Sequence, residues 1–303
     1  MRVFISTTTF AECNKETLRL LRKKNIDYVL NPYKRKLTEI EINNILSESS
    51  YVGLIAGIEP LTKQVLENAK SLRVISRVGV GLDNIDLHIA KQLNIQVYNT
   101  PSALVDCVPE LTIGLILCCL RRITSVDRNM RKKVWGKEMG LQFRDKILGI
   151  IGFGKMGKKV ARLAKAFGAK IVFNDIRTIK SRIAEYVSLN ELFKISDIIS
   201  IHYSSKERLI TKKEILRMKK GVILINTARG FAIDEDSLYG GLKSGKIGYA
   251  ALDVYNNEPY SGKLVNLDNI ILTPHIGSYA KEARIRMEAK AVENLIKGLA
   301  KTC

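Results

Sequence analysis

Proline and cysteine are both scarce in this sequence. Six prolines among 303 residues, together with a hydrophobic content of 46%, exclude collagen-like and low-complexity disordered classes, because such a chain can bury a large core. The cysteines number five, an odd count, and no two have the Cys-x-x-Cys spacing: Cys13, Cys107, Cys118, Cys119 and Cys303. This pattern is typical of free thiols in a reducing compartment, and it argues against a disulfide framework or a zinc site.

Long hydrophobic runs, a leader segment and metal-binding motifs are lacking as well. The longest apolar run covers residues 111–120, and ten residues cannot cross a hydrocarbon layer of ~30 Å. Residues 1–6 read as an immediate β-strand, which predicts that no signal peptide precedes the fold. No His, Cys and carboxylate residues share metal-ligand spacing, and there is no G-x-S-x-G nucleophile motif. We therefore expect a cytoplasmic protein with no bound metal and no membrane partner.

Acidic residues are too few to balance the basic ones. Lys plus Arg number 50 and Asp plus Glu number 30, so the formal net charge is +20. Such an excess raises nucleic acid as a possible partner class. The basic residues, however, occur singly or in short groups such as 22–24, 131–133 and 158–159, and no tail or stripe collects them. Their distribution favours a lysine-rich solvated surface over a nucleic-acid surface.

Short β-rich runs alternate with helical stretches along the chain. In the first hundred residues the runs at 3–6, 27–30, 52–56 and 72–76 are separated by helical patterns. This rhythm predicts a parallel sheet that is covered by helices on both faces. The first such unit is expected to end near Tyr98.

A long helix is expected from about residue 102 to 133, with a kink or a break at Pro109. A second alternating series follows from residue 146 and closes with a helix from about 279 to 298. The strands expected in it are 147–151, 170–174, 198–202, 222–226, 250–254 and 270–273. The sequence thus predicts an α/β protein of two doubly wound parallel-sheet domains, the second considerably larger.

A glycine-rich loop stands between a strand and a helix of the second series. Residues 152–157 read Gly-Phe-Gly-Lys-Met-Gly, directly after the apolar strand at 147–151. In this G-x-G-x-x-G pattern Gly152 permits a tight turn, Gly154 lets the backbone approach a pyrophosphate, and Gly157 lets the helix pack on the strand. A diphosphate would lie at the helix N-terminus, where free N–H groups favour negative charge.

An acidic residue follows the next strand at the position where a dinucleotide site needs one. Asp175 lies eighteen residues beyond Gly157, at the end of the strand 170–174. Its carboxylate would accept hydrogen bonds from ribose hydroxyls and repel a 2′-phosphate, which favours NAD over NADP. Arg177, two residues on, weakens that preference slightly.

Polar residues follow three late strands, where parallel sheets place their functional sites. Arg229 comes after the strand 222–226, Glu258 after 250–254, and His275 after 270–273. This set suits a 2-hydroxy acid, because Arg229 would bind the carboxylate in a bidentate fork and His275 would move the hydroxyl proton during hydride transfer. Glu258, hydrogen-bonded to His275, would fix the tautomer of the imidazole and favour its charged form.

Two further positions allow alternative interpretations. Gly79 and Gly81 follow the strand 72–76, and they form either a turn before a capped helix or a backbone site for a small carboxylate. His202 ends the strand 198–202, and we expect it to hydrogen-bond a neighbouring loop and to take no part in catalysis.

From about residue 50 to the C-terminus, the chain resembles the D-isomer-specific 2-hydroxyacid dehydrogenase family. The match is closest to the phosphoglycerate dehydrogenase branch. The resemblance rests on ordered motifs at 77–86, 152–157 with Asp175, 226–230, 251–254, 258–259 and 273–277. Two departures stand beside them: residues 202–205 read His-Tyr-Ser-Ser where members usually have His-x-Pro, and residues 108–110 read Val-Pro-Glu where Val-Ala-Glu is common.

The resemblance implies a fold, a cofactor and a set of roles. A Rossmann NAD-binding domain at 99–277 would be inserted into a flavodoxin-like substrate-binding domain formed by 1–98 and 278–303. Arg229, Glu258 and His275 would be the catalytic residues, and a homodimer through the cofactor domain is expected. The implied NAD contacts are Gly152, Gly154, Lys155, Met156, Gly157, Asp175, Tyr203, Thr227, Ala228 and Asp253, and the implied substrate contacts are Arg77, Val78 and Gly79.

The substrate class depends on Arg77, which is typical of the phosphoglycerate branch. The favoured reaction is oxidation of 3-phospho-D-glycerate to 3-phosphohydroxypyruvate, the entry to serine biosynthesis. A glyoxylate or hydroxypyruvate reductase of the same family is the alternative within the enzymes. The family also contains NAD-sensing transcriptional corepressors, so a binding protein is the alternative from another class.

Overall fold

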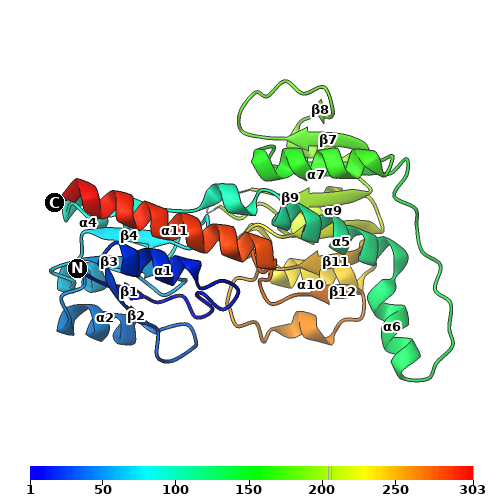
Figure 1. Ribbon diagram of the computed structural model, residues 1–303. Coiled ribbons are helices and arrows are strands. Elements are labelled where there is room, and N and C mark those ends of the chain that lie inside the picture. The colour runs from blue at the N-terminus through cyan, green and yellow to red at the C-terminus, as the bar shows by residue number, and fades with distance from the viewer. Residues whose placement is uncertain (204, 206, 303) are drawn as a thin grey trace. The chain divides into compact units, whose positions relative to one another are not determined.

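The computed structural model describes residues 1–203, 205 and 207–302 (Figure 1). The chain divides into two compact units, of which the first combines Met1–Leu104 with Ser278–Cys303 and the second is Val105–Gly277. The second unit is therefore an insertion in the first.

The chain passes from the first unit to the second after Leu104, later than the boundary expected at residue 98. The short 3₁₀ helix η1 (Pro101–Leu104) contacts the C-terminal helix α11 (Lys281–Thr302), which is itself part of the first unit. This contact keeps the chain in the first unit as far as Leu104.

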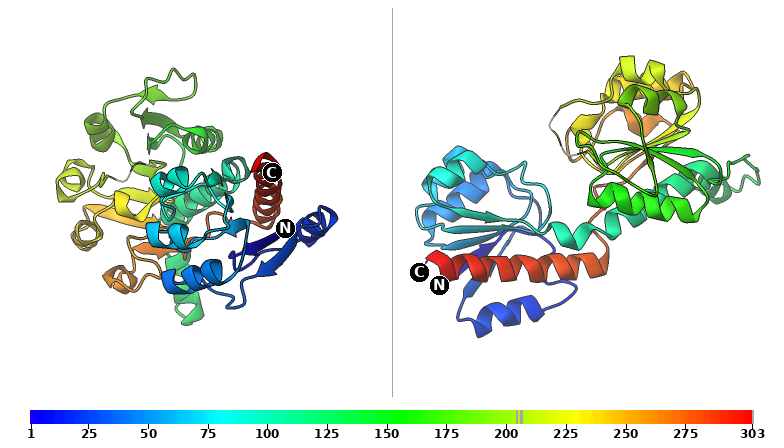
Figure 2. Two further views of the ribbon diagram at one scale, coloured as in Figure 1. Left: turned by 90° about the vertical axis from the view of Figure 1, so that its left-hand side faces the viewer. Right: turned by 90° about the horizontal axis from the view of Figure 1, so that it is seen from above.

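The first unit is built on a five-stranded parallel sheet with the strand order β2-β1-β3-β4-β5. Helices α2, α3 and α4 cover one face and α1 and α11 cover the other (Figure 2). Because both faces are covered, Val3, Phe4 and Ile5 of β1 are all buried. The bounds are β1 Arg2–Ile5, β2 Asp27–Leu30, β3 Gly53–Ala56, β4 Val74–Arg77, β5 Gln96–Tyr98, α1 Glu16–Lys23, α2 Glu39–Glu48, α3 Lys63–Asn68 and α4 Leu87–Gln92.

The second unit is built on a seven-stranded parallel sheet with the order β12-β11-β10-β9-β6-β7-β8. Helices α5 and α7 pack on one face, and α8, α9 and α10 pack on the other. The strands are β6 Ile147–Ile151, β7 Lys170–Asn174, β8 Glu185–Tyr186, β9 Ile198–Ile201, β10 Val222–Asn226, β11 Ile247–Leu252 and β12 Ile270–Leu272. The helices are α5 Cys107–Arg121, α6 Ile123–Arg131, α7 Lys155–Ala166, α8 Leu189–Ile195, α9 Lys212–Arg217 and α10 Glu235–Lys243, with 3₁₀ helices η2 Gly230–Ala232 and η3 Lys263–Asn266.

Both sheets have the topology of doubly wound α/β domains. The order in the second unit reverses between β6 and β9, as in the Rossmann fold, and the order in the first unit is that of flavodoxin. The predicted fold class is therefore confirmed. Ligands of such sheets bind beyond the carboxyl ends of the strands, where the order reverses.

The expected break at Pro109 is wrong. Pro109 is the third residue of α5. Backbone N–H groups in the first turn of a helix have no intrahelical acceptor, so a proline there costs no hydrogen bond. The helix ends instead at Arg122, which has a left-handed backbone (φ 58°), and α6 begins at the next residue. The two helices thus part at a left-handed C-cap.

Segment Pro101–Arg121 is long and apolar enough to cross a membrane when judged only by length and composition. In the structure, α5 packs on α7 and on strands β10 and β11. Ile116 and Cys119 of α5 are buried in the core cluster on that face of the sheet. The apolar character of this segment is therefore explained by a core helix.

Candidate active site

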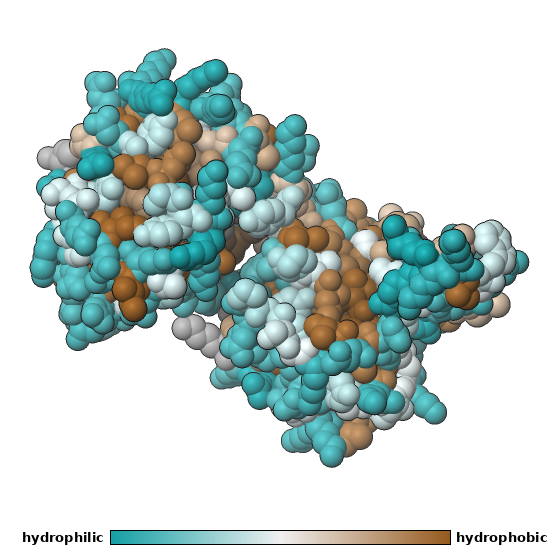
Figure 3. Space-filling model, turned by 90° about the horizontal axis from the view of Figure 1, so that it is seen from below, coloured by the Kyte–Doolittle hydropathy of each residue, from teal (hydrophilic) through white to brown (hydrophobic). Residues whose placement is uncertain are grey.

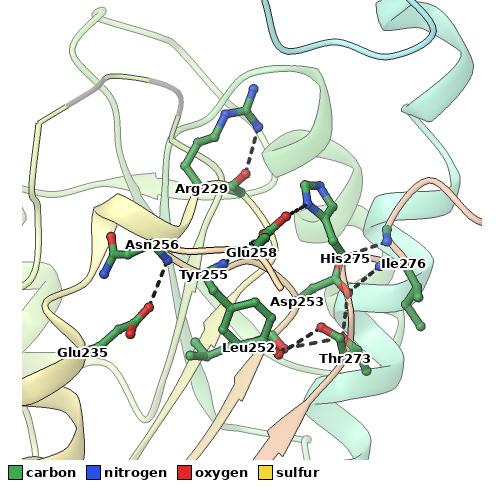
Figure 4. Close-up of polar contacts among 12 residues, drawn as sticks. Arg229, Glu235, Leu252, Asp253, Tyr255, Asn256, Glu258, Thr273, His275 and Ile276 are labelled. Carbon is green, nitrogen blue, oxygen red and sulfur yellow. Dashed lines mark hydrogen bonds and ion pairs between the residues drawn. The ribbon is translucent and has the colours of Figure 1, made fainter. Parts of the chain in front are cut away.

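Three neighbouring strands of the second unit carry Arg229, Glu258 and His275 on the loops that follow them (Figure 4). The loop after β10 is shaped by Asn226, whose side chain accepts from the Ala228 N–H at 3.1 Å and donates to the Arg229 carbonyl at 2.9 Å. The Arg229 guanidinium donates to the Ala228 carbonyl at 2.8 Å. The guanidinium of Arg229 is therefore held by a carbonyl of its own loop.

Glu258 and His275 form a direct pair. His275 Nδ1 lies 2.8 Å from Glu258 Oε2, and the other oxygen of Glu258 accepts from the Tyr255 N–H at 3.1 Å. The carboxylate is thus held by its own loop while it orients the imidazole. With Nδ1 engaged, Nε2 is the ring atom that can exchange a proton with a substrate. The His275 side chain is 50% exposed, so this proton remains accessible.

The glycine loop packs against the chain directly after β9, the strand that neighbours β6 in the sheet. Gly152 has a φ of +90°, and a Cβ there would lie 2.5 Å from the His202 carbonyl oxygen. A Cβ on Gly157 would lie 2.2 Å from the Gly152 carbonyl oxygen, so helix α7 packs directly on the loop. A Cβ on Gly154 would meet nothing within 4 Å. Gly154 therefore borders open space at the N-terminus of α7, where Lys155 and Met156 are the first two residues.

Asp175 is tied to the glycine loop. Its Oδ2 accepts from the Phe153 N–H at 2.7 Å, and its Oδ1 accepts from the Arg177 N–H at 2.9 Å. Burial opposes ionisation of this carboxyl, but the hydrogen bonds from Arg177 and Phe153 outweigh it and lower the pKa of Asp175. The carboxylate is therefore charged at neutral pH.

His202 is a structural residue of the next loop. Its N–H donates to the Ile151 carbonyl at 2.7 Å, and its Nε2 lies 2.9 Å from Ser200 Oγ. Burial lowers the pKa of His202 to about 4. Tyr203 donates its hydroxyl to the Glu207 carbonyl at 3.0 Å. The departure from His-x-Pro falls partly on Ser204, which lies outside the described residues.

Other predicted cofactor contacts have protein partners of their own. Thr227 Oγ1 lies 3.0 Å from Thr112 Oγ1 of helix α5, and Ala228 packs at the edge of a core cluster. The Asp253 carboxylate accepts from the turn that carries His275. Sequence reasoning missed Thr112, and it missed Thr273 and Tyr255 as supports of that turn. A polar residue at a strand end, such as Thr273, was the available signal.

The predicted substrate residues lie in the first unit. The Val78 N–H donates to the Ala56 carbonyl at 3.0 Å, and the Gly79 N–H donates to Thr100 Oγ1 at 2.9 Å. The Arg77 guanidinium donates to the Val78 carbonyl and lies over Gly79. Both predicted backbone donors thus already have acceptors within the first unit, and Arg77 folds back on its own loop.

A buried carboxyl that sequence reasoning missed stands near Arg77. Glu59 is 2% exposed, and its Oε1 accepts from Ser6 Oγ at 2.5 Å and from the Gly57 N–H at 3.2 Å. Burial raises the pKa of Glu59, while the Ser6 hydrogen bond and the positive charge of Arg77 act in the opposite direction.

Residues 113–277 match the family model described as D-isomer specific 2-hydroxyacid dehydrogenase, NAD binding domain, and this stretch is more than half of the chain. The chain belongs to this family. The resemblance inferred from the motifs is thereby confirmed.

Two curated relatives and one solved structure illustrate the similarity of this dehydrogenase to known proteins. Hydroxypyruvate reductase of Thermotoga maritima is 39% identical over 296 residues, covering 94% of this chain and 95% of that protein. D-3-phosphoglycerate dehydrogenase of Methanocaldococcus jannaschii is 39% identical over 260 residues, covering 82% of this chain and 49% of that protein. The crystal structure of the TT0316 protein from Thermus thermophilus has a TM-score of 0.91 and 33% identity, covering 99% of this chain and 97% of that one.

NAD is the cofactor of this dehydrogenase family, and the second unit fits it. The open side of Gly154 leaves room for a diphosphate at the N-terminus of α7, and the Asp175 carboxylate stands at the end of β7 for the ribose. Among residues 1–203, 205 and 207–302, no group of three or more His, Cys, Asp or Glu side chains could hold a metal ion.

Proposed function

We propose that this dehydrogenase reduces a small unphosphorylated 2-keto acid, hydroxypyruvate or glyoxylate, to the corresponding 2-hydroxy acid. The pair of His275 and Glu258 beside Arg229 supports the reaction class. The substrate is supported by the hydroxypyruvate reductase of Thermotoga maritima, which this chain matches along nearly its whole length, and by the charge of Arg77, which acts on the buried Glu59 carboxyl.

The residues of the second unit divide the chemistry among them. The open side of Gly154 and the Asp175 carboxylate would hold NADH, which would supply a hydride for the carbonyl carbon. Arg229 binds the substrate carboxylate through its planar fork and polarises the adjacent carbonyl. His275 donates the Nε2 proton to the carbonyl oxygen, which becomes the hydroxyl of the product. Glu258 holds the imidazole by Nδ1, which fixes its orientation and leaves Nε2 for the substrate oxygen.

A phosphorylated substrate would need cationic side chains for its second anionic group. Arg77 is the residue on which the sequence based the 3-phospho-D-glycerate prediction, but its charge acts on the buried Glu59 carboxyl. This interaction reduces its attraction for a phosphate. This supports the unphosphorylated acid over the phosphoglycerate reaction and its role in serine biosynthesis.

The test is a comparison of kcat/KM for hydroxypyruvate, glyoxylate and 3-phosphohydroxypyruvate with NADH. We expect hydroxypyruvate or glyoxylate to exceed the phosphorylated acid by at least ~tenfold, or ~1.4 kcal/mol. Arg77→Ala should leave the rate on the preferred acid almost unchanged. A preference for the phosphorylated acid that disappears in Arg77→Ala would instead establish the phosphoglycerate reaction.

We also propose that the enzyme is a homodimer formed through its cofactor domain. Hydrophobic side chains reach the surface in several patches (Figure 3), and α6 with the coil after it carries Trp135 and Met139, which are 82% and 92% exposed. Large exposed apolar side chains close together in sequence are typical of a protein contact surface. Light scattering should give the dimer mass for the wild type and the monomer mass for Trp135→Lys. A monomeric wild type would refute this proposal.

A cytoplasmic location is the last part of the proposal. The described cysteines Cys13, Cys107, Cys118 and Cys119 are all free, which suits a reducing compartment. Cell fractionation should recover the enzyme with cytoplasmic markers, and recovery outside the cytoplasm would contradict the proposal.

A further inference from the structure

Asp253 is buried directly after strand β11, and both oxygens of its carboxylate are occupied. Oδ1 accepts from Thr273 Oγ1 at 2.6 Å and from the Ile276 N–H at 2.8 Å, and Oδ2 accepts from the Gly277 N–H at 2.8 Å. Asp253 is 1% exposed. All three donors belong to one segment, residues 273–277, which we call the His275 turn (Figure 4).

The His275 turn has a conformation that needs support. His275 has a φ of +55°, a left-handed backbone that few residues other than glycine adopt. The His275 N–H donates to the Thr273 carbonyl at 3.0 Å, so the turn is tight. The Tyr255 hydroxyl also donates to the Thr273 carbonyl at 2.9 Å, whereas the Asp253 carboxylate contacts both sides of His275.

We propose that Asp253 is a positioning residue whose carboxylate holds the His275 turn in the left-handed conformation that directs the imidazole to Glu258. The inference rests on the proposed acid–base role of His275. The sequence motifs implied that Asp253 contacts NAD, and its hydrogen bonds in addition tie the carboxylate to the loop that carries the proton donor. A Cβ on Gly277 would lie 3.0 Å from Asp253 Oδ2, so the close approach of the turn to the carboxylate also depends on glycine at this position.

The variant Asp253→Asn separates this role from simple space filling. The amide has the size of the carboxyl, but it replaces one acceptor oxygen with an NH₂ donor, so at least one of the three donors of the His275 turn loses its acceptor. We expect kcat to fall by ~10²-fold, as for a displaced catalytic group. The dissociation constant of NADH, measured by fluorescence titration, should stay near the wild-type value.

A second pair of variants leaves the carboxylate in place. Thr273→Val removes one donor and should lower kcat by less than Asp253→Asn does, while Thr273→Ser keeps the hydroxyl and should restore the wild-type rate. These variants keep the test decisive if Asp253→Asn fails to fold. Equal rates in Thr273→Val and Thr273→Ser would overturn the inference, and so would a wild-type rate in a folded Asp253→Asn variant.

A double variant distinguishes action through His275 from action on the cofactor. If Asp253 acts by positioning His275, Asp253→Asn should cause little further loss of turnover in the His275→Gln background. If Asp253 contacts NAD, the two losses should multiply and the affinity for NADH should fall with Asp253→Asn. Full turnover of His275→Gln alone would instead refute the proposed function itself.

Discussion

The backbone of Gly230 packs directly on the backbone of Tyr255. A Cβ built on Gly230 would lie 1.9 Å from the Tyr255 carbonyl carbon and 2.0 Å from its oxygen. The loop that carries Arg229 is thereby held against the loop that carries Glu258. On the other side of the second loop, the Asn256 N–H donates to Glu235 Oε1 of helix α10 at 2.9 Å. The loops of Arg229 and Glu258 are thus joined through a backbone contact.

Gly230→Ala should therefore disrupt catalysis. Because the methyl group would meet backbone atoms that cannot move aside, the two loops must separate, and kcat/KM should fall by ~10²-fold or more. The matched control is Gly240→Ala in α10, where a Cβ meets nothing within 4 Å. It should leave kinetics unchanged and raise the free energy of unfolding by ~0.5–1 kcal/mol. Wild-type kinetics in Gly230→Ala would show that contact between the loops is not needed.

Two glycines of the loop 152–157 should respond differently to substitution by alanine. Gly157→Ala places a methyl group 2.2 Å from the Gly152 carbonyl oxygen and should lower the free energy of unfolding by ~1–3 kcal/mol. Gly154→Ala meets open space, so its stability should change by less than ~1 kcal/mol while its affinity for NADH falls by at least ~tenfold. Chemical denaturation and NADH titration measure the two effects. An unchanged NADH affinity in Gly154→Ala would place the diphosphate elsewhere.

His202 should make stability depend on pH. In the unfolded chain it takes up a proton near pH 6.5, whereas burial lowers its pKa to about 4 in the folded protein. The unfolded state therefore binds more protons between these values, and the free energy of unfolding falls as the pH is lowered from 6.5 towards 4, by at most ~1.4 kcal/mol per pH unit. This loss should be smaller in His202→Gln, measured by denaturant titration across that range. The same slope in both proteins would show that His202 does not titrate in this way.

The parts of the fold that depend on residue patterns were predictable. Strands 147–151, 170–174 and 222–226 have the predicted bounds, because strands buried on both faces read as continuous apolar runs. The two-residue strand β8 was not predicted, since its residues are exposed at the edge of the sheet. The break between the helices lies at Arg122 and not at Pro109. It was not predicted, because the residue type of an arginine does not indicate a left-handed backbone.

The candidate site was predictable in its residue types and not in its hydrogen bonds. Arg229, Glu258 and His275 follow strand ends, so their motifs identified them. The partners of Asp253, by contrast, lie about twenty residues away in the His275 turn, and only the folded chain brings them together. The same is true of the buried Glu59, whose carboxyl the charge of Arg77 reaches only in the folded chain.

The central claim is that His275 is the proton donor of a 2-keto acid reductase, and His275→Gln tests it most directly. The rate of NADH oxidation with hydroxypyruvate or glyoxylate should fall by ~10²–10⁴-fold, while the dissociation constant of NADH stays at the wild-type value. A turnover equal to that of the wild type, or a loss of NADH affinity that accounts for the fall in rate, would contradict the claim.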